Sequence, residues 1–111
     1  MKNRRLFYSA MLLSLTVGML VSAGVRAEGE IEAGRVKAIP CMGCHAIPGY
    51  SNVYPTYHVP RVGGQHTEYI VAALKAYKSK QRSHPTMQAQ AASLSEDDMN
   101  DIAAFFSSKP E

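Results

Sequence analysis

Cysteine is scarce in this sequence of 111 residues, and tryptophan is absent. The two cysteines, Cys41 and Cys44, both lie in the segment CMGCH, which His45 completes. A structural zinc site would need four nitrogen or sulfur ligands, and neither a second cysteine pair nor a histidine cluster supplies them. A βαβ pattern is also missing, which disfavours a thioredoxin-like oxidoreductase with a redox-active disulfide in this segment.

The N-terminus has the pattern of an export signal. MKNRR is basic, the apolar segment after it carries no charge, and Val25 and Ala27 occupy the small-residue positions that a signal peptidase prefers. We therefore expect residues 1–27 to be a cleaved signal peptide, with residues 21–23 as a second possible cleavage site, and residues 28–111 to form one exported domain. The alternative is a retained anchor, because about 20 apolar residues can just span a bilayer.

Positive charge is not in excess once this segment is removed. Four of the 12 basic residues lie in the predicted signal, which leaves eight basic residues against nine acidic ones. The basic pI of the whole chain is therefore no evidence of nucleic-acid binding. An exported domain of about 84 residues is near the size at which a hydrophobic core alone is marginal, so we expect a disulfide, a metal or a cofactor to stabilise it.

Apolar spacing predicts helices, and no segment has a convincing strand pattern. A short amphipathic helix is expected over residues 30–39, ended by Pro40, and a longer one over residues 67–80. A third helix over residues 94–108 begins with a capping box at Ser95. These segments predict an all-α domain of three to four helices.

Two long irregular segments separate the predicted helices. Residues 46–64 are rich in proline and glycine and have no steady period, and residues 81–93 are broken at His84-Pro85. Loops this long in a compact domain are mostly functional or wrapped around something. We therefore expect these loops to enclose a bound group.

The segment CMGCH matches C-x-x-C-H, the attachment motif of c-type haem. Two thiols a short, nearly fixed distance apart can add to the two vinyl groups on one edge of the porphyrin. The histidine that follows then lies beneath the ring, where its imidazole can ligate iron. Haem c is therefore favoured over the disulfide and the zinc site.

Methionine is the sixth iron ligand in many electron-transfer cytochromes. Met42 lies inside the attachment segment, and Met99 falls on the apolar face of the last predicted helix, where methionine ordinarily fills the core. Met87 lies in the predicted loop SHPTMQ, where no helix face claims its side chain. We therefore predict Met87 as the distal ligand.

The chain resembles the class I c-type cytochromes, and within them the cytochrome c4-like and c553-like single-domain group. The resemblance is carried by CMGCH, PRVGGQHTEYIVAALKAYKS, HPTM and LSEDDMNDIAAFFSS, in that order. It implies a cytochrome c fold with long loops around one covalent haem, held by Cys41, Cys44, His45 and Met87. It also implies that the Pro60 carbonyl accepts a hydrogen bond from His45 Nδ1–H, which would orient a metal-bound imidazole.

Further residues are expected around the haem. Three polar side chains are candidate donors to its propionates, which would otherwise be buried charges without partners: Arg61, Tyr54 and Tyr57. Three histidines are expected at the surface or beside the propionates, although each could compete for iron if the methionine were displaced: His58, His66 and His84.

The first and last helices of such proteins cross closely, and Gly34 is placed for that crossing with Phe105 or Phe106.

The predicted function is periplasmic one-electron transfer by a His/Met-ligated haem c, without enzymatic chemistry. The donor would be a cytochrome bc-type complex or a dehydrogenase, and the acceptor a terminal oxidase or reductase. Nucleic acid is not an expected partner, and a membrane would be reached only through partners or an uncleaved signal. One alternative is the haem c electron-accepting subunit of a periplasmic dehydrogenase complex. Another is a five-coordinate haem that binds gas or reacts with peroxide.

Overall fold

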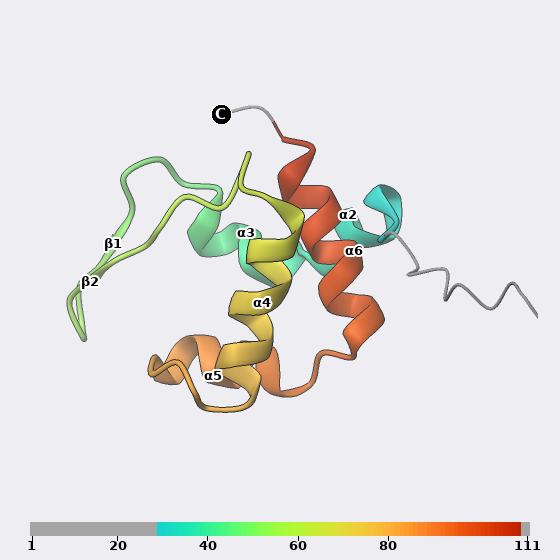
Figure 1. The fold of residues 1–111 in the computed structure, drawn as a ribbon. Coiled ribbons are helices and arrows are strands. Elements are labelled where there is room, and N and C mark those ends of the chain that lie inside the picture. The colour runs from blue at the N-terminus through green and yellow to red at the C-terminus, as the bar shows by residue number, and fades with distance from the viewer. Residues whose placement is uncertain (1–28, 110–111) are drawn as a thin grey trace, which may run out of the picture.

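The computed structural model describes residues 29–109, so the predicted signal peptide lies outside the described residues. Within this range the chain forms five helices and one small antiparallel ladder (Figure 1). The helices are α2 (Ile31–Lys37), α3 (Ile39–His45), α4 (Thr67–Lys78), α5 (Pro85–Ala92) and α6 (Glu96–Ser107). The ladder pairs β1 (Ser51–Asn52) with β2 (Tyr57–His58). The predicted all-α class is confirmed, with more helices than the three or four expected.

The crossing of α2 and α6 is set by a glycine. A Cβ atom added at Gly34 would lie 1.9 Å from the carbonyl oxygen of Asp101 and 2.9 Å from the Cβ of Phe105. Only a residue without a side chain allows the two helices to approach this closely. The predicted contact between Gly34 and the last helix is therefore confirmed.

Polar contacts reinforce the same crossing. Asp101 accepts a hydrogen bond from the backbone N–H of Glu30 at 2.7 Å. The ammonium group of Lys37 pairs with Asp98 at 2.8 Å and with Asp101 at 2.6 Å. These contacts lower the pKa of both carboxyl groups and raise the pKa of Lys37, with the hydrogen bonds between them as the main cause.

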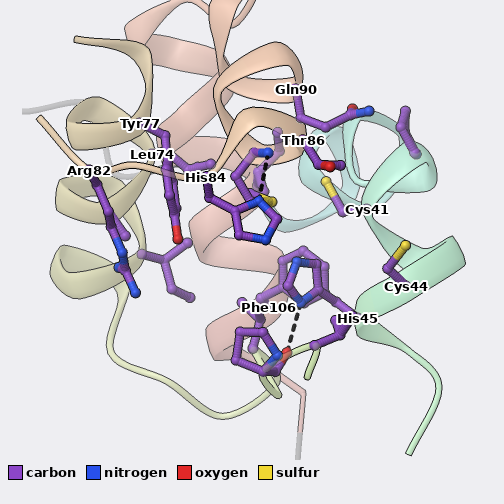
Figure 2. A pocket seen from close by; sticks show the side chains of 18 of the residues that line it. Cys41, Cys44, His45, Leu74, Tyr77, Arg82, His84, Thr86, Gln90 and Phe106 are labelled. Carbon is purple, nitrogen blue, oxygen red and sulfur yellow. Dashed lines mark hydrogen bonds between the residues drawn. The ribbon is translucent and has the colours of Figure 1, made fainter. Parts of the chain in front are cut away.

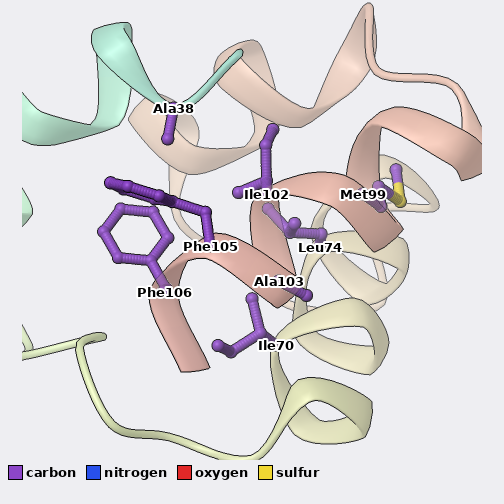
Figure 3. Close-up of a cluster of buried hydrophobic side chains, with 8 residues drawn as sticks. All are labelled: Ala38, Ile70, Leu74, Met99, Ile102, Ala103, Phe105 and Phe106. Carbon is purple, nitrogen blue, oxygen red and sulfur yellow. The ribbon is translucent and has the colours of Figure 1, made fainter. Parts of the chain in front are cut away.

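The hydrophobic core lies where α4 packs against α6, close to the start of α3 (Figure 3). Its buried residues are Ala38, Ile70, Leu74, Met99, Ile102, Ala103, Phe105 and Phe106. Met99 is only 2% exposed, so it fills the core as expected. The predicted capping box of α6 is also present, because Ser95 Oγ accepts from the Asp98 N–H at 3.1 Å while Asp98 accepts from the Ser95 N–H at 2.9 Å.

Two predictions about prolines were wrong. Pro40 was expected to end a helix, but it lies in the first turn of α3, so CMGCH is helical. Residues 81–93 were expected to be a loop, but Pro85 begins α5, which places Met87 in a helix. The physical reason is the same in both cases, because a first-turn residue needs no N–H donor and proline already has a helical φ.

The loop prediction for residues 46–64 holds apart from the short β1–β2 ladder. Within residues 29–109, no helix combines the length and the apolar character needed to cross a bilayer.

Candidate metal centre

A cavity of about 590 Å³ opens between α3, α4, α5 and the loop that follows β2 (Figure 2). Ligand sites for small molecules are typically about 300–1,000 Å³. Its wall contains the four predicted attachment and ligand residues, Cys41, Cys44, His45 and Met87. The cavity therefore brings together residues that are up to 46 positions apart in the sequence.

Helix α3 carries three of these residues on one face. Positions three and four apart on a helix are neighbours on its surface, so Cys41 lies beside both Cys44 and His45. All three are partly buried and line the cavity. Burial raises the pKa of the Cys41 thiol. The helical form of CMGCH thus directs both thiols and one imidazole at the same space.

The orientation of His45 is fixed by a backbone carbonyl. His45 Nδ1 is 2.7 Å from the carbonyl oxygen of Pro60, and Figure 2 shows this contact as a dashed line below the ring. A carbonyl can only accept a hydrogen bond, so Nδ1 must carry the hydrogen. The Nε2 lone pair is then free to bind a metal, which is the arrangement common for histidine ligands.

The facing wall of the cavity comes from the start of α5. His84 precedes Pro85 as the N-cap residue, and its Nδ1 accepts a hydrogen bond from the Met87 N–H at 3.3 Å. The His84 ring lies across the cavity from His45 in Figure 2. Both His84 and Met87 are partly buried and line the cavity. The sequence indicated His84 as a residue at the surface or near the propionates that could compete for iron, and the structure places it on the cavity wall beside Met87.

Only some of the other predicted polar residues line the large cavity. Tyr57 and His58 line the large cavity. Arg61 does not line it and instead borders a neighbouring cavity of about 490 Å³, which His45 also lines. Tyr54 is 92% exposed at the hairpin, and neither it nor His66 lines either cavity.

Arg82 and Tyr69 are among the polar residues of the cavity wall that sequence reasoning missed. A hydrogen bond to Tyr69 is the main cause that raises the pKa of Arg82, and the Arg82 guanidinium also lies 4.9 Å from the centroid of the Tyr77 ring. A guanidinium beside a phenol suits a carboxylate. The position of Arg82 within the segment QRSHPTM, five residues before the predicted ligand, is the signal that could have indicated it.

These residues fit a c-type haem. One helix offers two thiols and an imidazole with a free lone pair, and a second helix offers a thioether sulfur. Ile70, Leu74 and Phe106 give the cavity an apolar wall. Imidazole and thioether form the ligand set of electron-transfer cytochromes.

Comparisons with known proteins agree with this geometry. No family model matches the chain. Cytochrome c-554(548) of Halomonas halodenitrificans is 36% identical in an alignment of 84 residues that covers 73% of this chain and 98% of that protein. The chain belongs to the c-type cytochromes. Membership in this family implies a covalently bound haem c.

The cytochrome c4 proteins are further relatives. Cytochrome c4 of Pseudomonas aeruginosa is 31% identical over 99 residues, covering 89% of this chain and 48% of that protein. A second cytochrome c4, from Stutzerimonas stutzeri, is 31% identical over 107 residues and is covered to 50%. The chain thus spans about half the length of the cytochrome c4 relatives that it matches.

Solved structures confirm the cytochrome c fold. Cytochrome c4 of Acidithiobacillus ferrooxidans matches with a TM-score of 0.56 at 25% identity, over 90% of this chain and 64% of that one. Thiosulfate dehydrogenase (TsdBA) from Marichromatium purpuratum matches with a TM-score of 0.62 at 26% identity, over 76% of this chain and 20% of that one. With the relatives above, these matches identify a class I, cytochrome c4-like member of the family.

Proposed function

We propose that this protein is a periplasmic one-electron carrier with a single haem c, attached through Cys41 and Cys44 and ligated by His45 and Met87. The observation that carries the proposal is the 2.7 Å hydrogen bond from His45 Nδ1–H to the Pro60 carbonyl. It leaves the other imidazole nitrogen free at the end of the attachment helix, facing a cavity of suitable size. Export would follow from cleavage after Ala27, leaving residues 28–111 as the mature domain.

The role of the chain is to keep the proposed iron ligands in the same positions in both oxidation states. When bound, the haem supplies a one-electron iron couple, whose potential is raised by a methionine ligand. The Pro60 carbonyl fixes the plane of the His45 ring, so the proximal side needs little rearrangement. Ile70, Leu74 and Phe106 exclude water from the apolar wall. Arg82 and Tyr69 offer polar groups suited to the haem propionates.

The expected redox partners are other proteins of the periplasm or of a membrane complex. The donor would be a cytochrome bc-type complex or a dehydrogenase, and the acceptor a terminal oxidase or reductase. With eight basic and nine acidic residues after residue 27, strong electrostatic steering toward a partner is not expected.

A second candidate function is the haem c electron-accepting subunit of a periplasmic dehydrogenase complex. The structural match to thiosulfate dehydrogenase favours it, because that match covers 76% of this chain. The exposed hairpin tip, with Val53 64% and Tyr54 92% exposed, offers a surface for such a complex. Purification of the tagged protein from its native periplasm separates the two functions, since a subunit elutes with a stoichiometric second polypeptide and a free carrier elutes alone.

The ligand assignment is tested by the far-red absorption spectrum of the oxidised protein. A weak sulfur-to-iron charge-transfer band is expected in the wild type and in Met42→Ala, which serves as the matched control. The same band should be absent from Met87→Ala. A wild type without the band, or a Met87→Ala variant that keeps it, contradicts the assignment. A wild type that binds carbon monoxide readily without denaturant would instead favour the five-coordinate alternative.

A further inference from the structure

We infer that His84 selects the distal ligand, because a single hydrogen bond both positions Met87 and leaves the His84 imidazole with an N–H group, and no lone pair, on the cavity side. This inference rests on the proposed haem ligation. His84 is a positioning residue in the wild type and a ligand only when the methionine sulfur is lost. The argument depends on the tautomers of two imidazoles that share one cavity.

The two imidazoles face each other across the cavity. His45 extends from the end of α3, and His84 extends from the start of α5. In Figure 2 the His84 nitrogen that is free of the dashed hydrogen bond points toward the His45 ring. Both residues line the same cavity. His84 is therefore placed as a second possible iron ligand beside Met87.

Opposite hydrogen-bond partners give the two rings opposite tautomers. A neutral imidazole has one N–H donor and one acceptor nitrogen. His45 Nδ1 faces a carbonyl and must donate, which leaves a lone pair on Nε2. His84 Nδ1 faces the Met87 N–H and must accept, which leaves the hydrogen on Nε2. Only His45 thus presents a lone pair to the cavity, while His84 presents an N–H group.

Aromatic neighbours hold the His84 ring in this position. The ring is edge-on to Tyr57, with centroids 4.6 Å apart, and edge-on to Tyr77 at 6.4 Å. The Tyr57 hydroxyl also lies 3.4 Å from Thr86 Oγ1, on the first turn of α5. The hairpin and α4 therefore support the ring that caps the Met87 segment.

The cap matters because α5 is little buried. Ala91 is its only buried residue. Loss of an N-cap interaction costs about 0.5–2 kcal/mol, which corresponds to about a 2- to 30-fold change in an equilibrium. A cap of this size can decide how often Met87 leaves the iron. It is weaker than a metal–imidazole bond, so His84 should exchange the cap for iron when the sulfur is removed.

The positioning role is tested with two His84 variants of the haem-loaded protein. His84→Ala removes the cap, and His84→Asn replaces the ring with the side chain most favoured at N-caps. We expect His84→Ala to weaken the far-red sulfur band and to raise the affinity of the ferric protein for added imidazole by about 2- to 30-fold. His84→Asn should stay within about twofold of the wild type. The matched control is His66→Asn, at the N-cap of α4, where no side-chain cap hydrogen bond exists.

The role of His84 as a replacement ligand is tested by removing the Met87 sulfur. Met87→Ala should give a low-spin electron paramagnetic resonance spectrum of two nitrogen ligands, and the double variant with His84→Asn should lose it. The inference is overturned if His84→Ala binds imidazole as the wild type does, or if the single and double variants have the same spin state. A wild type without the sulfur band instead overturns the proposed ligation, so the two failures are distinguishable.

Discussion

Helices α5 and α6 follow one another in the chain, but different interactions hold them in place (Figure 1). Helix α6 buries five residues, namely Met99, Ile102, Ala103, Phe105 and Phe106, and it has a complete capping box. Helix α5 buries only Ala91 and is capped by a single histidine contact. One helix belongs to the hydrophobic core, and the other forms a wall of the cavity.

This difference indicates that the stability of the core and the position of the proposed distal ligand depend on different helices. Apolar burial is the main source of helix stability in a folded protein, so α6 should open only when the whole domain unfolds. Helix α5 has little burial and should open locally at a lower free energy. The segment that carries Met87, the proposed distal ligand, should therefore be the one that responds to the state of the iron.

The largest expected effect comes from filling the close approach of α2 and α6. Gly34→Val places a side chain where even a Cβ would be 1.9 Å from a backbone oxygen of α6. We expect a loss of about 3 kcal/mol in the free energy of unfolding, measured by urea denaturation, because the backbone must shift. The control is Gly43→Ala, where an added Cβ meets nothing within 4 Å. Equal stability of the two variants would show that this crossing does not support the core.

The next effect should be confined to α5. The double variant Met87→Ala with His84→Asn removes both the proposed iron–sulfur bond and the imidazole that would replace it. Backbone amides of α5 should then exchange hydrogen at least about tenfold faster, as for a loss of about 1.4 kcal/mol. Amides of α6 should change by less than about threefold. Native-state hydrogen exchange with mass spectrometry measures both helices in one sample. Equal acceleration in α5 and α6 would mean that the two helices open as one unit.

A smaller effect on stability should distinguish the N-cap of α6 from the N-cap of α5. Ser95→Ala removes the hydroxyl that accepts from the Asp98 N–H, and we expect it to lower the free energy of unfolding by about 1 kcal/mol. The far-red sulfur band should be unchanged, in contrast to His84→Ala. Ser93→Ala, an exposed serine at the end of α5, is the control. A change in the band of Ser95→Ala would contradict the separation of core and ligand segments.

The smallest effect concerns the ion pairs of Lys37 with Asp98 and Asp101. Because the pKa of each carboxyl group is lowered by Lys37, their contribution to stability is present above the ordinary carboxyl pKa of about 4 and is lost as the pH falls below it. The pKa of Lys37 is raised, so its contribution to stability depends on pH in the opposite direction and is lost only at strongly alkaline pH. Stability curves of the wild type and Lys37→Met should converge in acid. Parallel curves would show that these pairs contribute nothing pH-dependent.

Sequence reasoning succeeded where the signal is local. The α6 helix was predicted because its apolar stripe and its capping residues lie within one segment. The motif itself indicates Cys41, Cys44 and His45, and the structure places all three on the wall of one cavity, while their bonds to haem stay a prediction. Pro60 was assigned only through the family resemblance, and the hydrogen bond to His45 is present in the structure.

The failures arose where packing against a cavity replaces packing against the core. Helix α5 has a single buried residue, so no apolar period marks it in the sequence. Tyr69 has the spacing of the apolar face of α4, but it is 53% exposed and lines the cavity together with Arg82. The cap that ties His84 to Met87 depends on a ring orientation, which residue spacing alone does not specify.

The most direct test of the account identifies the ligated methionine by nuclear magnetic resonance. The reduced, haem-loaded protein would carry ¹³C at its methionine methyl groups. The account predicts one methyl resonance shifted strongly upfield by the haem ring current, which disappears in Met87→Leu and remains in Met42→Leu. An upfield methyl that belongs to Met42 or Met99, or the absence of any shifted methyl, would contradict ligation by His45 and Met87.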